Sequence, residues 1–170
     1  MENKFWVAVM RACPMHLWHQ AVIEQMIKYH KWNCMIILWG RWHEFDARHI
    51  FDFEERRRII WQKYDNIHID GVRDCGSNDE RLANLDKVIW NIYDGDLWNV
   101  LYRGWCPEDV IYFTENNRQT KTLDRFDGST PVISATQVRA RLADWLDLDG
   151  YIDTELQEYI RNLYQNKFTL

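Results

Sequence analysis

Near its amino terminus the chain reads FWVAVMRACPMHLWH, from Phe5 to His19. The first six of these residues, Phe5–Met10, are all apolar, which favours a strand buried on both faces of a sheet. Pro14 then marks a turn, and residues 17–29 have the spacing of an amphipathic helix. This order of strand, loop and helix predicts the opening of a βαβ unit.

The same alternation continues along the chain. A second apolar run, Cys34–Trp39, predicts a parallel strand reached by a right-handed crossover, with Val7 and Ile37 on adjacent central strands. Further on, the patterns predict strands over 66–72 and 109–114, a loop over 117–130, and helices over 53–64, 79–92, 134–145 and 154–164, the first and last of them capped by Asp52 and Asp153. We therefore expect a single α/β domain over residues 1–170, a doubly wound, Rossmann-like parallel sheet of about five strands.

Charge and composition limit the partners of this domain. The 170 residues carry a formal net charge of −5, so we expect no general attraction to nucleic acid or to an anionic membrane. The four cysteines form no CxxC pair and are interpreted as reduced thiols. We see no signal-peptide pattern and no apolar stretch of membrane-spanning length, so a cytoplasmic location is expected. A small phosphorylated ligand remains compatible with this charge, because it needs only a local cluster of basic groups.

The loop after the first strand carries Arg11, His16 and His19. Doubly wound sheets bind ligands beyond the carboxyl ends of their strands, and free N–H groups at the start of a helix favour phosphate. The spacing of three places both imidazoles on one side of the helix. An ordinary, partly exposed histidine pair is the alternative interpretation. A zinc pair would lack a third ligand at metal-site spacing, so no protein-bound metal is expected.

These residues resemble the opening GRFxPxHxGH of the HxGH nucleotidylyltransferases, most closely the nicotinamide mononucleotide adenylyltransferases of archaeal, bacterial or phage type. Arg11, Pro14, His16 and His19 match that pattern in order. Four further blocks are similar to the family: FDFEER at 51–56 to NPFxFEER, VRD at 72–74 with ND at 78–79 to VRDxxxND, FTEN at 113–116 to FTGN, and ISATQVR at 133–139 to ISATxIR.

The resemblance implies adenylyl transfer from ATP to nicotinamide mononucleotide, giving NAD and pyrophosphate without a covalent enzyme intermediate. It also implies that Mg²⁺ is held mainly by phosphates and water. The implied catalytic residues are His16, His19 and Arg139. The implied nucleotide-binding residues are Arg11, Gly40, Ser134 and Thr136, and those for the acceptor nucleotide are Arg73, Asp74, Asn78 and Trp98, although Trp98 fits an ordinary core residue equally well.

Several positions depart from the family pattern. Trp18 replaces the glycine of HxGH, Met10 replaces the glycine before Arg11, and Glu115 replaces the glycine of FTGN. An indole at position 18 would occupy space used by the adenine or ribose, because glycine there lets the nucleotide approach the backbone. Two alternatives therefore stay open: a related nucleotidylyltransferase of other specificity, or a catalytically impaired nucleotide-binding protein, in either case compatible with a homo-oligomer.

Overall fold

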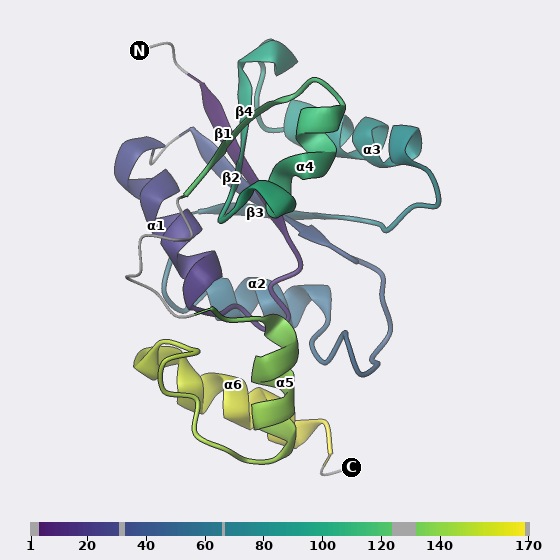
Figure 1. Cartoon of the computed structure of the whole chain (residues 1–170). Helices are drawn as coiled ribbons and strands as arrows, with labels where there is room; N and C mark the ends of the chain where they lie inside the picture. The colour runs from purple at the N-terminus through teal and green to yellow at the C-terminus, as the bar shows by residue number, and fades with distance from the viewer. Residues whose placement is uncertain (1–3, 31–32, 66, 124–131, 169–170) are drawn as a thin grey trace.

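A computed structural model of the chain describes residues 4–30, 33–65, 67–123 and 132–168 (Figure 1). All five strands in this part of the chain are parallel and stand in the order β3-β2-β1-β4-β5. Their bounds are β1 Phe5–Met10, β2 Cys34–Trp39, β3 His68–Val72, β4 Val100–Gly104 and β5 Gln119–Thr122. The expected doubly wound, Rossmann-like sheet of five strands is confirmed.

The first four helices cover both faces of this sheet, and the last two lie together next to the second helix (Figure 1). They are α1 Leu17–His30, α2 Phe53–Trp61, α3 Asn78–Trp90, α4 Pro107–Glu115, α5 Ala135–Ala143 and α6 Thr154–Asn166, with a short 3-10 turn, η1, at Leu97–Asn99. None of these helices combines the length and the apolar character that crossing a membrane requires.

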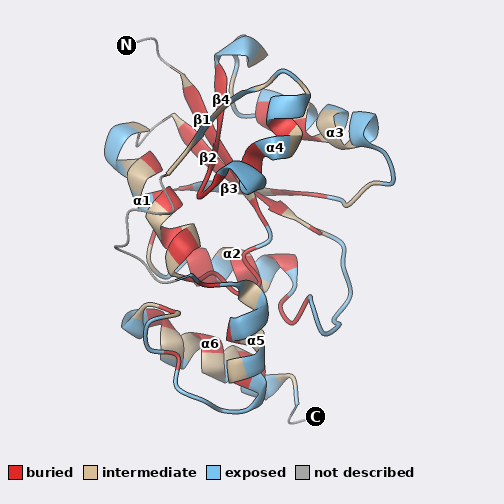
Figure 2. Cartoon of the chain, in the orientation of Figure 1, coloured by how far each residue is buried: buried red, intermediate tan, exposed pale blue. Residues whose placement is uncertain are grey.

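The uniform apolar character of β1 follows from its position at the centre of the sheet (Figure 2). Trp6, Ala8 and Met10 pack into one core cluster with residues of α1 and α2. Phe5 and Val7 face the opposite way and pack with residues of α3 and α4. Because successive side chains of a strand point to opposite faces, a strand covered on both sides has no polar face. As expected, β1 and β2 are neighbours, with Val9 opposite Ile37.

The order in which strands are added to the sheet reverses at β1. It runs outward through β2 to β3 and then returns to add β4 and β5 on the other side of β1. The carboxyl ends of β1 and β4 therefore flank the point where strand order reverses, which is where open α/β sheets bind their ligands.

The predicted helix caps are present. The Asp52 carboxylate accepts a hydrogen bond from the Glu55 backbone N–H at 2.8 Å, and Asp153 accepts one from the Glu155 N–H at 3.1 Å. Ser134 caps α5 by accepting from the Gln137 N–H at 3.2 Å. Caps depend on residues within one turn of each other, which explains why the sequence predicts them correctly.

Two expectations about the second half of the chain are wrong. Residues 109–114 lie in helix α4 rather than in a strand, and the strand before it is β4. Pro107 stands in the first turn of α4, and Val110 and Phe113 are buried one turn apart, so this apolar run serves one helical face. The predicted loop over 117–130 contains the edge strand β5 within its described part, and its residues 124–130 lie outside the described residues.

Candidate active site

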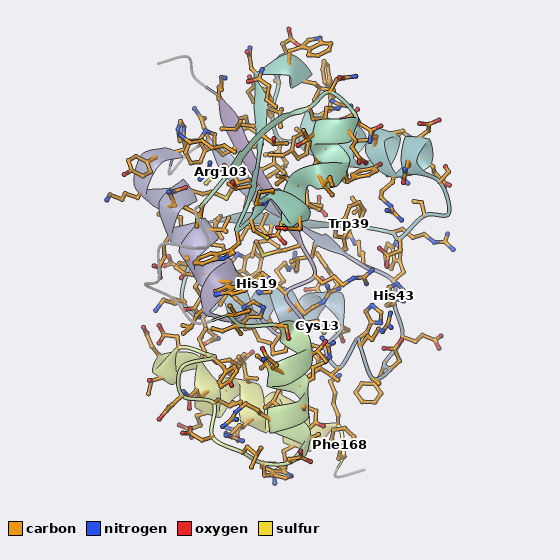
Figure 3. All side chains as sticks on the ribbon, in the orientation of Figure 1. Cys13, His19, Trp39, His43, Arg103 and Phe168 are labelled. Atoms are coloured by element: carbon orange, nitrogen blue, oxygen red, sulfur yellow. The ribbon has the colours of Figure 1, made fainter. Side chains whose placement is uncertain are left out.

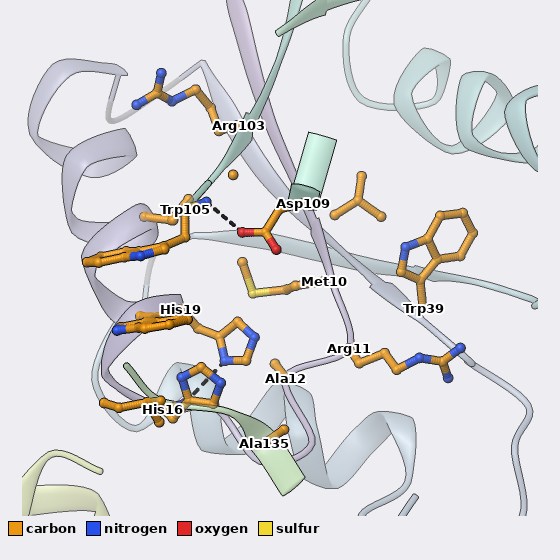
Figure 4. A pocket seen from close by; sticks show the side chains of 15 residues that line it. Met10, Arg11, Ala12, His16, His19, Trp39, Arg103, Trp105, Asp109 and Ala135 are labelled. Atoms are coloured by element: carbon orange, nitrogen blue, oxygen red, sulfur yellow. Dashed lines mark hydrogen bonds between the residues drawn. The ribbon is translucent and has the colours of Figure 1, made fainter. Parts of the chain in front are cut away.

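A cavity of about 380 Å³ opens at the carboxyl ends of β1 and β4, beside the start of α1 (Figure 4). Its size falls within the range of small-molecule binding sites. The side chains that matter most to its chemistry come from three separate segments of the chain: Arg11, His16, His19, Trp105, Asp109 and Ala135.

The two histidines lie against each other at the start of α1. Their ring centroids are 3.9 Å apart, and the His16 backbone N–H donates to Nδ1 of His19 at 3.2 Å. Because Nδ1 of His19 accepts a hydrogen bond, the neutral ring carries its proton on Nε2 and can donate it. Both rings line the cavity, as the loop position of the pair predicts.

Burial keeps both imidazoles neutral at pH 7. Desolvation lowers the pKa of His16 to about 4. Desolvation, with a smaller contribution from the neighbouring His16, lowers the pKa of His19 well below its usual value. In the free protein the pair therefore offers hydrogen-bond donors and acceptors rather than positive charge.

These low pKa values predict that acid destabilises the protein. An unfolded His16 binds a proton near pH 6.5 and a folded one only near pH 4, so the free energy of unfolding should fall as the pH drops through that window. The difference corresponds to about 3 kcal/mol for His16. Urea unfolding at pH 7, 5.5 and 4 measures it, with His16→Asn as the matched variant. An equal loss in both proteins would contradict the assignment of this effect to His16.

Buried polar atoms of the cavity lack partners within the described part of the chain. These are His16 Nδ1, Trp105 Nε1, and the Nε and one Nη atom of Arg103, all on residues that line the cavity. A buried polar atom without a hydrogen bond costs about 1–3 kcal/mol, and such atoms in native proteins usually meet a ligand or water. The wall of the cavity is therefore suited to a polar ligand.

Trp18 and Trp105 form an aromatic wall of the same cavity. Their rings are parallel within 2° with centroids 5.2 Å apart, and Trp18 is 8% exposed. The His16 and Trp18 rings form a T-shaped pair with centroids 6.2 Å apart. Trp18 thus belongs to the core and to the cavity wall at the same time.

Helix α5 reaches the loop that carries the histidines. Arg139 donates one hydrogen bond to the Cys13 carbonyl at 3.0 Å and another to the Thr136 hydroxyl at 3.1 Å. Ser134 caps the helix, and Ala135 lines the cavity. The structure therefore brings the start of α5 beside His16 across more than a hundred residues, with Ser134, Thr136 and Arg139 bordering the cavity rather than lining it.

Arg11 lies at the opposite side of the cavity from the histidine pair (Figure 4). Its guanidinium donates to Nε2 of His49 at 2.7 Å and forms an ion pair with Asp74 at 3.1 Å. Arg73 and Asp74 line a shallow depression next to it, together with the loop after β2. The predicted acceptor-side residues Arg73 and Asp74 are thus adjacent to Arg11.

Gly40 shapes this loop instead of lining the cavity. Its φ is +71°, a region that favours glycine, and a Cβ there would lie 2.6 Å from the His43 ring. Its carbonyl accepts a hydrogen bond from Arg56 at 2.9 Å.

Arg56 is a residue whose role the sequence did not reveal. Its side chain is 1% exposed, and it donates to the carbonyls of Arg11, Trp39 and Gly40 at 2.7–2.9 Å. It therefore ties the carboxyl ends of β1 and β2 together beneath the site. Arg56 is part of the FEER block, but the motif does not tell whether this arginine stabilises the strand ends or binds a ligand.

Two predicted acceptor-side residues line neither the cavity nor the depression beside Arg11. Asn78 is the first residue of α3, and its carbonyl accepts from the Tyr112 hydroxyl. Trp98 lies in η1, directly before β4, so it is at the amino end of the sheet, opposite the cavity. It is 69% exposed, so the alternative interpretation as a core residue is also wrong.

Because residues 109–114 were predicted as a strand, Trp105 and Asp109 were not predicted as site residues. Both line the cavity, and Asp109 accepts hydrogen bonds from the backbone N–H groups of Trp105 and Cys106 at 2.9 and 3.2 Å. The apolar run Val100–Tyr102 before Arg103 and Gly104 is the pattern that could have identified the strand end.

Comparison with known proteins places this architecture among solved structures. No protein-family model matches the sequence, and no significant match is found among curated proteins. A bifunctional NMN adenylyltransferase/ADP ribose pyrophosphatase from Francisella tularensis has a similar fold, with a TM-score of 0.71, 17% identity, and coverage of 96% of this chain and 52% of that chain.

Two further solved structures have a similar fold. The Francisella protein complexed with AMP and a manganese ion gives a TM-score of 0.67 at 17% identity, covering 96% of this chain and 51% of that one. NadR protein in complex with NAD and AMP-PNP gives 0.57 at 20% identity, covering 84% and 44%. This chain spans about half the length of the Francisella protein. It has the Rossmann-like α/β fold that these adenylyltransferase and NadR structures share.

Proposed function

We propose that this chain transfers the adenylyl group of ATP to nicotinamide mononucleotide, producing NAD and pyrophosphate. The observation that carries the proposal is the meeting of His16, His19 and the start of α5 at one cavity beside the strand switch point. The resemblance to the HxGH family and the fold shared with adenylyltransferases support the same assignment.

The reaction needs no nucleophile from the protein. An oxygen of the acceptor's 5′-phosphate forms a bond to the α-phosphorus of ATP, the bond from that phosphorus to the bridging oxygen breaks, and pyrophosphate leaves. The protein's part is to position the reactants and stabilise charge. Neutral His16 and His19 would donate hydrogen bonds to phosphate oxygens, whose charge raises the pKa of both rings. Arg11 and Arg139 would supply positive charge at the two sides of the cavity.

Mg²⁺ would enter with ATP and shield the phosphate charges. Among the described residues, Asp109 is the acidic side chain that lines the cavity, and its Oδ2 atom already accepts from two backbone N–H groups. This donor set fits an ion held by phosphate oxygens and water rather than by the protein. The acceptor nucleotide would lie toward Arg73 and Asp74, adjacent to Arg11.

An assay of NAD formation tests the proposal. The purified chain is incubated with ATP, Mg²⁺ and nicotinamide mononucleotide, and NAD is measured by a coupled dehydrogenase. Nicotinate mononucleotide and CTP replace the two substrates in parallel reactions. We expect NAD with the first pair. Thermal stabilisation by ATP without any dinucleotide product would contradict the proposal and indicate a nucleotide-binding protein instead.

A smaller ring at position 18 should strengthen ATP binding. The Trp18 indole occupies part of the cavity wall, and one of its faces is covered by Trp105. Trp18→Phe should cost about 1–2 kcal/mol of stability through lost apolar burial. Calorimetry should show tighter ATP binding in the same variant, because the cavity becomes wider. Trp90→Phe, on the exposed side of α3, is the control. Weaker ATP binding by Trp18→Phe would identify the indole as a surface that supports the nucleotide.

A further inference from the structure

A second group of polar side chains lies beyond the ends of β2 and β3, apart from the histidine pair (Figure 3). His43 and His49 belong to the loop after β2, and Asp74 belongs to the loop after β3. One ligand-type atom from each residue lies within 4.8 Å of the other two. The His43 Nε2 atom is 2.6 Å from the Asp74 carboxylate.

His49 is held in an orientation that leaves one nitrogen available. Its Nδ1 is 2.9 Å from Asp46, whose carboxylate also accepts the backbone N–H groups of Arg48 and His49 at 2.7 and 2.8 Å. The Nδ1 atom of His49 is therefore the donor, and its Nε2 lone pair points toward the cluster. Metal-binding histidines typically have such a carboxylate on the second nitrogen.

A positive group already contacts two of the three residues. The Arg11 guanidinium bonds both to Nε2 of His49 and to the Asp74 carboxylate, at 2.7 and 3.1 Å. The lone pairs of His49 Nε2 and of the Asp74 carboxylate are thus directed at a cation now. The His43 Nε2 atom donates to Asp74, so it must give up that proton to bind an ion. The Arg11 side chain is 49% exposed, so it can leave this position without disturbing the core.

We propose that His43, His49 and Asp74 form a binding site for Zn²⁺ or a similar divalent transition metal, and that Arg11 and the ion exchange at the same position. Two imidazole nitrogens with one carboxylate oxygen favour such ions over Mg²⁺. Water or a phosphate oxygen would complete the coordination.

The geometry requires only a local adjustment. The His43 and His49 rings are stacked 4.0 Å apart and parallel within 8°, so one ring must tilt for both nitrogens to meet a single ion. The His43 side chain is 39% exposed and free to do so, while His49 stays fixed by Asp46. The site shares Asp74 and Arg11 with the proposed nucleotide-binding residues, but Zn²⁺ affinity is measured without turnover, so either proposal can fail while the other holds.

Calorimetric titration of the metal-free protein with ZnCl₂ tests the site. We expect one ion per chain, and we expect His49→Gln and Asp74→Asn to weaken binding by at least about tenfold. Asp46→Asn should weaken it by a similar factor, because it removes the orienting carboxylate. Two matched controls should leave the affinity unchanged: His68→Gln, an exposed histidine on β3, and Cys75→Ser, the thiol beside Asp74.

Arg11→Met gives the opposite and most specific result. Removing the competing guanidinium should tighten Zn²⁺ binding, which a nonspecific surface site would not do. Unchanged or weaker binding by Arg11→Met would overturn the exchange, and equal affinity of the wild type and His49→Gln would overturn the site. If a ligand variant fails to fold, the zinc anomalous signal in crystals of the wild-type protein decides: density between His43, His49 and Asp74 supports the site, and zinc bound elsewhere overturns it.

Discussion

Arg56→Met is expected to lower the free energy of unfolding by about 3–5 kcal/mol. Methionine fills much of the space but leaves the carbonyls of Arg11, Trp39 and Gly40 without the donors that Arg56 supplies. Each buried carbonyl that loses its partner costs about 1–3 kcal/mol. Because these carbonyls end β1 and β2, the variant should also lose ATP binding when it is measured below its unfolding temperature.

Urea unfolding of the purified variant provides the measurement. The matched control is Arg58→Met on the same helix, where the arginine is exposed and the change should stay within about 0.5 kcal/mol. A loss below 1 kcal/mol for Arg56→Met would mean that the strand ends find other donors, and the anchoring role would have to be abandoned.

His19→Ala is expected to reduce turnover by about 10²–10³, with much less effect on stability. This prediction depends on the proposed adenylyl transfer. The Nε2 proton of His19 is the donor that the cavity offers to a developing phosphate charge, since Nδ1 already accepts from the His16 backbone. Steady-state NAD formation measures turnover, and urea unfolding measures stability.

Two further variants test whether the loss of turnover is due to the missing His19 hydrogen-bond donor. His19→Asn keeps a side-chain N–H donor and should recover part of the lost turnover. His68→Ala removes an exposed histidine on β3, far along the chain from the cavity residues, and should leave turnover unchanged. A His19→Ala enzyme that retains more than a tenth of wild-type turnover would show that this imidazole does not stabilise the transition state.

The first half of the fold was predictable from local pattern. The apolar runs of β1 and β2 are buried on both faces, and a strand of that kind has a continuous apolar sequence whatever its neighbours are. The caps Asp52, Ser134 and Asp153 were equally predictable, because each accepts a hydrogen bond from a residue two or three positions away. The position of His16 and His19 beyond a strand end follows from the same order of elements.

The second half required long-range information. The run from Val110 to Phe113 is apolar in either a strand or a helix, and packing against β4 decides for the helix. The alternating strand β5 is polar because it lies at the edge of the sheet, a place that only the assembled sheet defines. Trp98 was also placed wrongly because β4 was not predicted. Since β4 begins at Val100, Trp98 lies at the amino end of the sheet, away from the cavity.

The environment of each functional group was likewise a property of the tertiary structure alone. Burial makes the His16 imidazole neutral, and the cavity that it lines is completed by Trp105 and Ala135, which lie far along the chain. Arg11 is held by His49 and Asp74, which lie 38 and 63 positions away along the chain, and Arg56 is buried only because two strand ends close over it. Residue type and spacing can name such groups, but their pKa values and partners depend on desolvation and on contacts distant in sequence, which no local pattern contains.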